Sequence, residues 1–238
     1  MRSTISLFLC GLALAILSSC HLIRSSAPNA SLNVMTFNVR YNNPNDGENA
    51  WPLRQTRFAL LQQGTFWLST TPEQPGSVGW DAALTRVCTW GKFKDRDTRK
   101  IFFLFNTHFD HMGEKARIES AKLIREKIQT LAPTEPIIVT GDFNANPNSL
   151  VYQTMTTGTP ENEKQNNHLL DTRAISQLPH YGPRWTFHGF GAATERPLID
   201  YIFVNHRAIV RRHGTIAESI DGRYASDHLP VLAELVWK

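Results

Sequence analysis

The pattern of hydrophobic and polar positions along the chain predicts a domain rich in β-strands, with one long helix. Apolar residues in segment 114–131 recur with helical spacing and define one face of an amphipathic helix. Segment 57–68 is interrupted by Gly64 and predicts either one bent strand or two short strands. Other apolar, β-prone runs predict strands at 32–39, 86–93, 100–107, 136–140 and 229–236.

Three further segments complete this expected set of elements. Residues 198–204 and 208–218 look like a pair of neighbouring strands, and 149–156 predicts a short helix. The lysines and arginines of the long helix are expected on its solvated face. Many strands with one clear helix favour a sheet-dominated α/β or α+β domain.

The first twenty residues have the pattern of an export signal. Arg2 precedes an apolar run from Ile5 to Leu17, and small residues follow. The run is too short for a good transmembrane helix, which needs about 20 apolar residues. The sequence LSSC, ending at Cys20, resembles a lipoprotein signal in which Cys20 becomes the lipidated first residue; an ordinary cleaved signal is the alternative.

These features predict an exported protein, either periplasmic or attached to the outer membrane or cell surface through lipid on Cys20. We expect a leader at 1–20, a tether at 21–31 and a single domain at 32–238. Cleavage before Cys20 removes Arg2, so the formal net charge falls from +4 to +3 and does not indicate a nucleic-acid partner. Three cysteines cannot form a disulfide scaffold, and Cys88 is expected to be a buried small side chain.

Polar side chains gather at the ends of several predicted strands. They lie in the clusters TFNVR (36–40), NTHFDH (106–111), GDFN (141–144) and SDH (226–228), with Asp200 upstream in LIDYIFV. Singly, each cluster is typical of a turn or of a surface histidine. Together, the carboxylate and amide oxygens suit Mg²⁺ or Mn²⁺ rather than Zn²⁺, and the imidazoles can donate to phosphate oxygens or exchange protons. The combination favours metal-assisted attack of water on a phosphate ester.

In this order, the clusters resemble the endonuclease/exonuclease/phosphatase superfamily, in particular an exported bacterial branch. The matching blocks span most of residues 32–236: TFNVRYNNPNDGENAWPLR, GTFWLSTTPEQPGSVGWDAALTR, NTHFDHMGEKARIES, GDFNANP, TFHGF, IDYIFV and SDHLPVLAEL. The resemblance implies a two-sheet α/β sandwich flanked by helices. It also implies Mg²⁺- or Mn²⁺-dependent hydrolysis of a phosphodiester or phosphomonoester. Nucleic acid, a phospholipid headgroup and a small sugar phosphate all stay open as substrates.

The resemblance further implies roles for individual residues. Asn38 would lie beside the metal and Asp227 would be a metal ligand. Asp142 would orient or activate the attacking water, and Asn144 would hold the phosphate or Asp142. His108 would donate a hydrogen bond to a phosphate oxygen.

A histidine–carboxylate pair completes the implied site. His228 would contact the phosphate or move a proton, and Asp200 would fix its tautomer and orientation. Some positions have two interpretations, as pocket lining or as organisers of loops; they are Asp110, His111 and His188. Arg86 is expected in the core or at the rim of the site.

One expected part of the family pattern is missing. A strand ending in Gln-Glu, whose Glu is a principal metal ligand, should follow the first helix, but WPLRQ continues directly into TRFALLQQGTFWLS. The join lies near Gln55–Arg57, and a natural deletion and a gene-model error both fit it. We expect weak Mg²⁺ binding, a truncated first sheet and uncovered apolar surface. The alternative function is a non-catalytic phosphate-binding or vestigial lipoprotein.

Overall fold

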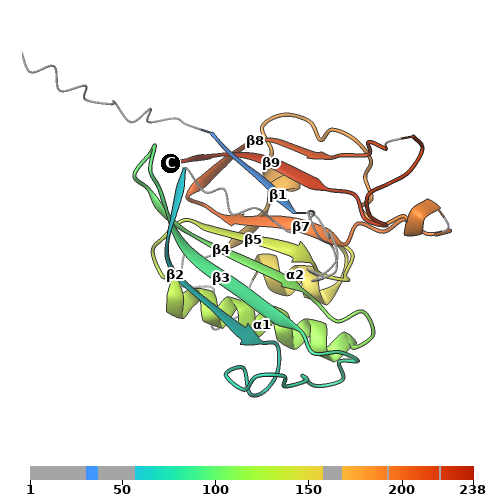
Figure 1. Cartoon of the computed structure of the whole chain (residues 1–238), viewed down its shortest axis with the longest axis horizontal. Helices are drawn as coiled ribbons and strands as arrows, with labels where there is room; N and C mark the ends of the chain where they lie inside the picture. The colour runs from blue at the N-terminus through green and yellow to red at the C-terminus, as the bar shows by residue number, and fades with distance from the viewer. Residues whose placement is uncertain (1–30, 37–56, 158–167, 192, 220) are drawn as a thin grey trace, which may run out of the picture.

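The strands form two sheets packed face to face, as the computed structural model shows for residues 31–36, 57–157, 168–191, 193–219 and 221–238 (Figure 1). The larger sheet has the order β2 (Phe58–Trp67), β3 (Val87–Asp95), β4 (Ile101–His108), β5 (Ile137–Asp142), β7 (Asp200–Asn205) and β6 (Leu169–Asp171). The smaller sheet has the order β1 (Leu32–Thr36), β9 (Val231–Trp237) and β8 (Ala208–Thr215). Among the strands of the described residues, only β4 and β5 pair in parallel.

Helices flank the larger sheet, which confirms the predicted fold class of a two-sheet α/β sandwich. The helices α1 (Glu114–Leu131) and α2 (Leu150–Thr157) cover the face of this sheet that points away from the smaller sheet (Figure 1). The short helix α3 (Thr172–Ile175) follows β6, and a 3-10 turn spans Gly189–Gly191. The bounds of α1 match the apolar spacing of the sequence. No helix in the described ranges is long and apolar enough to cross a membrane.

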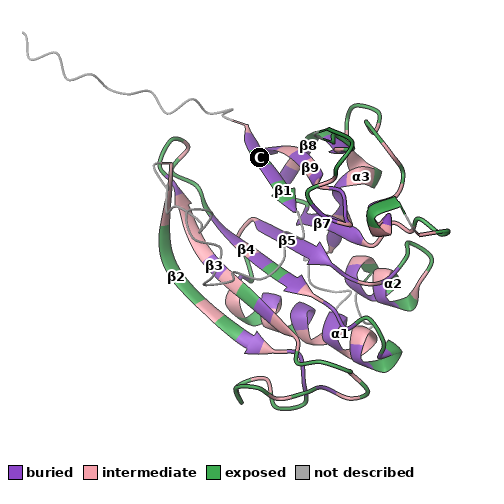
Figure 2. Ribbon diagram, turned by 45° about the vertical axis from the view of Figure 1, so that its right-hand side comes forward, coloured by how far each residue is buried: buried purple, intermediate pink, exposed green. Residues whose placement is uncertain are grey.

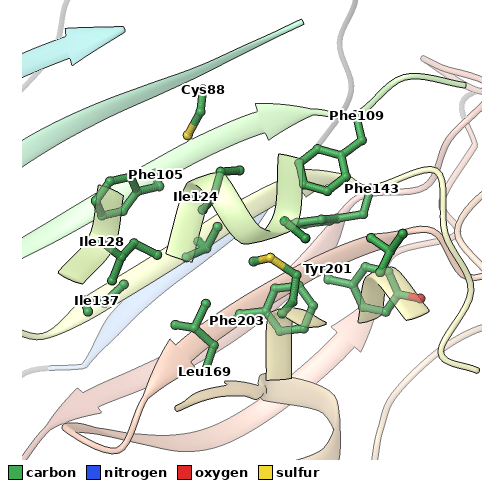
Figure 3. Close-up of a cluster of buried hydrophobic side chains, with 14 of the residues drawn as sticks. Cys88, Phe105, Phe109, Ile124, Ile128, Ile137, Phe143, Leu169, Tyr201 and Phe203 are labelled. Carbon is green, nitrogen blue, oxygen red and sulfur yellow. The ribbon is translucent and has the colours of Figure 1, made fainter. Parts of the chain in front are cut away.

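The core has two layers because successive side chains of a strand point to opposite faces. On β4, Phe103 and Phe105 face the helices, where Figure 3 shows Phe105 beside Ile124 and Ile128 of α1. Phe102 of the same strand faces the smaller sheet. All residues of β5 and β7 are buried because both faces of these strands are covered. Cys88 is also fully buried, as expected, and burial raises the pKa of its thiol.

The smaller sheet covers only part of the larger one. Figure 2 shows buried residues along β5, and exposed ones along β2. The side chains of Leu60 and Leu61 on β2 are 42% and 46% exposed. An apolar opening of about 270 Å³ lies between the sheets, lined in part by Met35, Phe58 and Phe93. Within the described residues, three strands face six, and apolar surface is exposed at one end of the larger sheet. The truncation of the first sheet stays a prediction.

Two expectations from the sequence are wrong. Segments 198–204 and 208–218 do not form a strand pair, because β7 hydrogen-bonds to β5 and β6 while β8 hydrogen-bonds to β9 of the other sheet. The short link at 206–207 crosses between the sheets instead of closing a hairpin. Arg125 of α1 is buried rather than solvated, and its guanidinium donates to the Met155 carbonyl at 2.7 Å.

Candidate active site

Three adjacent strands place polar side chains at the same end of the larger sheet. The parallel register of β4 and β5 sets His108 opposite Asp142, and the antiparallel register of β5 and β7 sets Asp142 opposite Asp200. His228 comes from the segment that leads into β9 of the other sheet. The junction of the two sheets therefore brings together residues from three of the four clusters of the sequence, and Asp200.

The four side chains form a connected group. His228 Nδ1 lies 2.8 Å from Asp200 Oδ2, which is hydrogen-bond distance. His228 Nε2 and His108 Nε2 lie 3.6 and 3.3 Å from Asp142 Oδ2. Asp142, Asp200 and His228 are buried, whereas the His108 side chain is 42% exposed. Three side chains of the group are therefore buried, and the His108 imidazole reaches the surface.

Local backbone geometry fixes Asp142. Gly141 has φ 153°, and a Cβ there would lie 2.0 Å from the Thr107 carbonyl oxygen, so only glycine lets β5 approach β4 this closely. Asn144 has φ 47°, its backbone N–H donates to Asp142 Oδ1 at 2.9 Å, and its side-chain amide donates to the Phe109 carbonyl. The left-handed turn in GDFN therefore orients the Asp142 carboxyl group.

Burial and neighbouring charges shift the acidity of the group. Burial, together with the Asp200 charge, raises the pKa of Asp142 to about 7. Burial disfavours the charged form of His228, but its hydrogen bond to Asp200 and the nearby carboxylates outweigh this and raise its pKa. Burial and the Arg86 and His228 charges lower the pKa of His108 to about 4. At pH 7, His108 is neutral and Asp142 is close to its midpoint.

The chemistry of these donors fits a divalent cation. Asp142, Asp200 and His228 each offer one ligand atom, and these atoms all lie within 4.8 Å of one another. Two buried carboxyl groups this close favour a bound positive charge, because their like charges repel each other. Oxygen-rich sites suit hard cations.

Neither of the two metal ligands expected from the sequence lies in the ligand group found among the described residues. Asn38 lies outside the described residues. Asp227 is half-buried and accepts a hydrogen bond from the Ser226 hydroxyl at 3.3 Å, and it is not part of the ligand group found among the described residues. Its carboxylate still contributes to the raised pKa of His228. Asp200, which the resemblance gives only an orienting role, lies in the ligand group instead.

The positions with two interpretations surround the site. Asp110 accepts hydrogen bonds from the backbone of Leu84, Met112 and Gly113, which supports the organiser interpretation. These backbone donors outweigh burial and lower its pKa. His111 Nδ1 lies 3.2 Å from Arg86 Nη2.

Arg86 and His188 differ in their surroundings. Arg86 is half-buried and its Nε lies 3.5 Å from Asp110 Oδ2, and its charge helps to lower the pKa of His108. The His188 ring is buried, with its centroid 4.3 Å from that of Tyr224.

A cleft of about 590 Å³ adjoins His228 and Asn144. Its polar lining includes Glu114 and Arg117 from the first turn of α1, and its apolar lining includes Phe187. The sequence did not indicate these residues as neighbours, because Glu114 and Arg117 belong to the long helix and Phe187 belongs to the distant TFHGF segment. Only the helix spacing and the presence of TFHGF were available as signals.

Comparison with known proteins identifies the family of this fold. The model of the Endonuclease/Exonuclease/phosphatase family matches residues 60–228, and the chain belongs to this family. Its members are metal-dependent hydrolases that act on phosphate esters. An endonuclease/exonuclease/phosphatase structure from Bacteroides vulgatus is 38% identical, with TM-score 0.71, covering 78% of this chain and 68% of that chain.

Two further relatives extend the comparison. The mannosyl-6-phosphatase of Bacteroides thetaiotaomicron is 38% identical, with TM-score 0.67, covering 77% of this chain and 69% of that chain. An uncharacterised protein of Acanthamoeba polyphaga mimivirus is 30% identical over 173 residues, which are 70% of this chain. The chain spans 62% of the length of that curated relative.

Proposed function

We propose that this chain is a Mg²⁺- or Mn²⁺-dependent phosphoesterase that hydrolyses its substrate by attack of water. The observation that carries the proposal is the buried group of Asp142, Asp200 and His228, with neutral His108 at its mouth. Metal-assisted phosphate chemistry needs carboxylates for a cation and imidazoles for phosphate oxygens and protons, and this group supplies both. Family membership supports the same reaction class.

Each residue has a role that follows from its position. Asp142 and Asp200 would hold the cation, with Asn38 and Asp227 as the further ligands expected from the sequence. A bound cation supplies positive charge to the phosphate oxygens. Asp142, whose carboxyl group lies beside His228 Nε2, would orient or activate the attacking water.

The two imidazoles act on the phosphate. Asp200 holds Nδ1 of His228, so Nε2 is the nitrogen that faces Asp142 and donates to the phosphate or moves a proton. His108 is neutral at pH 7 and donates from its exposed ring to a phosphate oxygen. Asn144 holds Asp142 in place.

We propose a sugar phosphate monoester as the substrate class. A relative that is 38% identical is a mannosyl-6-phosphatase. The cleft beside His228 combines Glu114, Asn146 and Ser149 with the ring of Phe187. Carboxylate, amide and hydroxyl groups bind sugar hydroxyls, and an aromatic ring packs against the apolar face of a sugar.

Phosphate release from mannose 6-phosphate, measured with Mn²⁺ and with Mg²⁺, tests this proposal. We expect release by the wild type that is lost in Asp142→Ala and His228→Ala. His206→Ala is the matched control, because His206 is exposed in the turn between β7 and β8. Equal background in all four proteins contradicts the proposal and supports phosphate binding without turnover. Faster hydrolysis of bis-p-nitrophenyl phosphate or of an oligonucleotide overturns the monoester assignment alone.

We also propose that the protein is exported and anchored through lipid on Cys20. The support is the leader pattern of residues 1–20, which lie outside the described part of the chain. Mass spectrometry of the mature protein decides between lipidated Cys20 and an unmodified N-terminus.

A further inference from the structure

The TFHGF segment contacts the backbone of both members of the Asp200–His228 pair. It lies outside the two sheets, and an isolated bridge joins Phe187 to His228. Of its residues, Thr186 has no exposed surface, and its side chain and backbone bond to two different elements.

The Thr186 side chain bonds to the start of β7. Its hydroxyl oxygen Oγ1 accepts hydrogen bonds from the backbone N–H of Ile199 at 3.0 Å and of Asp200 at 3.1 Å. The Thr186 N–H donates to the Pro197 carbonyl at 3.0 Å, which closes the contact from the other side. One hydroxyl therefore satisfies both donors at the point where β7 begins and Asp200 projects into the site.

The Thr186 main chain bonds to the segment that carries His228. Its carbonyl accepts from the Leu229 N–H at 2.7 Å. The N–H groups of His188 and Gly189 donate to the Asp227 carbonyl at 2.9 and 3.2 Å. These bonds flank His228 on both sides, and the Phe187 ring packs against its imidazole with centroids 5.1 Å apart.

We propose that Thr186 is a positioning residue, whose hydroxyl sets the distance between Asp200 and His228 and so orients the imidazole for reaction. The Thr186 hydroxyl bonds to the backbone N–H of Ile199 and Asp200, so it acts on the Asp200 carboxyl group through the Asp200 backbone. Without an acceptor at Oγ1, the two N–H groups would be buried and unpaired, and the start of β7 would shift to find other partners. This role rests on the proposed hydrolysis of a phosphate ester by the Asp200–His228 pair.

The substitution Thr186→Val tests the hydroxyl, because valine keeps the shape of threonine and removes the acceptor. We expect kcat for mannose 6-phosphate to fall about 10- to 100-fold, the range for lost outer-shell partners, with KM nearly unchanged. Thr186→Ser keeps the acceptor and should restore kcat. The matched control is Thr172→Val, because Thr172 is also fully buried but donates to the Ile202 carbonyl, further along β7.

A spectroscopic readout makes the test independent of turnover. The Nδ1 proton of His228, shared with Asp200, should give a downfield imidazole resonance in NMR spectra that disappears in His228→Ala. We expect this resonance to be retained in Thr186→Ser and Thr172→Val, and to be lost or shifted in Thr186→Val. If the wild type shows the resonance but hydrolyses nothing, the proposed function fails while the role of Thr186 is still decided by this signal.

Three outcomes overturn the proposal. The first is an unchanged resonance and kcat in Thr186→Val. The second is an equal loss of kcat in Thr172→Val. The third is failure of both Thr186→Val and Thr186→Ala to fold while Thr186→Ser folds, which assigns the hydroxyl to the fold rather than to the site.

Discussion

The centre and the edge of the larger sheet differ in how completely they are covered. Every residue of β5 is buried between the helices and the smaller sheet, while Leu60 and Leu61 of β2 are exposed at the far edge. The proposed site uses the covered centre, where β4 and β5 end and β7 begins. The apolar opening lies between β1 and the larger sheet, where Phe58 of β2 and Phe93 of β3 line it.

This difference separates the proposed site from the place where the sequence predicts a missing segment. Asp142 and Asp200 project from strands that both layers of the core hold in place, so their geometry does not depend on the uncovered edge. The missing segment would remove a metal ligand and covering structure without disturbing these strands. Substitutions at the centre of the larger sheet should therefore change stability and cation binding much more than substitutions at the β2 edge.

The largest expected difference is in core packing. Phe143→Ala should lower the free energy of unfolding by about 3–5 kcal/mol, because Phe143 is buried against Phe109 and Phe203 under the centre of the sheet. The control Phe190→Ala removes the same ring from a position that is 65% exposed, and should change the free energy by about 0.5 kcal/mol or less. Urea unfolding measures both, and equal losses would show that the centre is not the better packed region.

The second largest effect comes from the ionised Asp142 carboxylate. The folded pKa is about 7, above the ordinary value near 4, so the wild type loses stability as the pH rises between these two values. Asp142→Asn removes this cost and should stabilise the protein by about 2 kcal/mol at pH 8. The gain should fade as the pH falls toward 4.

Thermal unfolding at several pH values without divalent cations measures this effect. The control is Asp97→Asn, because the Asp97 side chain is 53% exposed and lies outside the buried group of the site. A variant that is less stable than the wild type at pH 8 would contradict the raised pKa.

A smaller effect concerns cation binding. Mn²⁺ or Mg²⁺ should stabilise the wild type by about 1 kcal/mol at millimolar concentrations, because two carboxylates remain but the expected Glu is absent. Asp142→Asn should lose this response. Calorimetric titration checks the affinity, and tight, specific Mg²⁺ binding would show that the missing segment does not weaken the site.

The smallest effect on stability is expected at the uncovered edge. Leu61→Lys should change the free energy of unfolding by about 0.5 kcal/mol or less, yet reduce self-association, because it replaces exposed apolar surface with charge. Gln62→Lys on the same strand adds the same charge without removing apolar surface, and serves as the control. Sedimentation velocity measures association, and equal behaviour of the two variants would contradict a role for the exposed leucines.

Much of the fold could be predicted from local patterns. The apolar spacing gave the bounds of α1, and β-prone runs located β3, β4, β5 and β9, because these elements bury one or both faces in a regular way. The sequence could not show that β7 and β8 belong to different sheets. Two buried strands joined by a short link have the same sequence pattern whether or not they share a sheet. The three residues of β6 were too few to form a pattern.

The sequence identified some residues of the site but not others. The motifs identified His108, Asp142 and His228, which the structure brings together. Thr186 has no such signal, because its role arises from two backbone donors, Ile199 and Asp200, which lie thirteen and fourteen residues later at the start of β7. The placement of Asp200 within reach of a cation also depends on strand register rather than on its own motif.

The most direct test of the proposed hydrolase is phosphate release from mannose 6-phosphate at rising Mn²⁺ concentration, with the wild type and His228→Ala measured side by side. We predict release by the wild type that increases into the millimolar range of Mn²⁺, stops with EDTA and is lost in His228→Ala. Release that is the same in both proteins, or that does not respond to Mn²⁺, would contradict a metal-dependent site built on Asp142, Asp200 and His228.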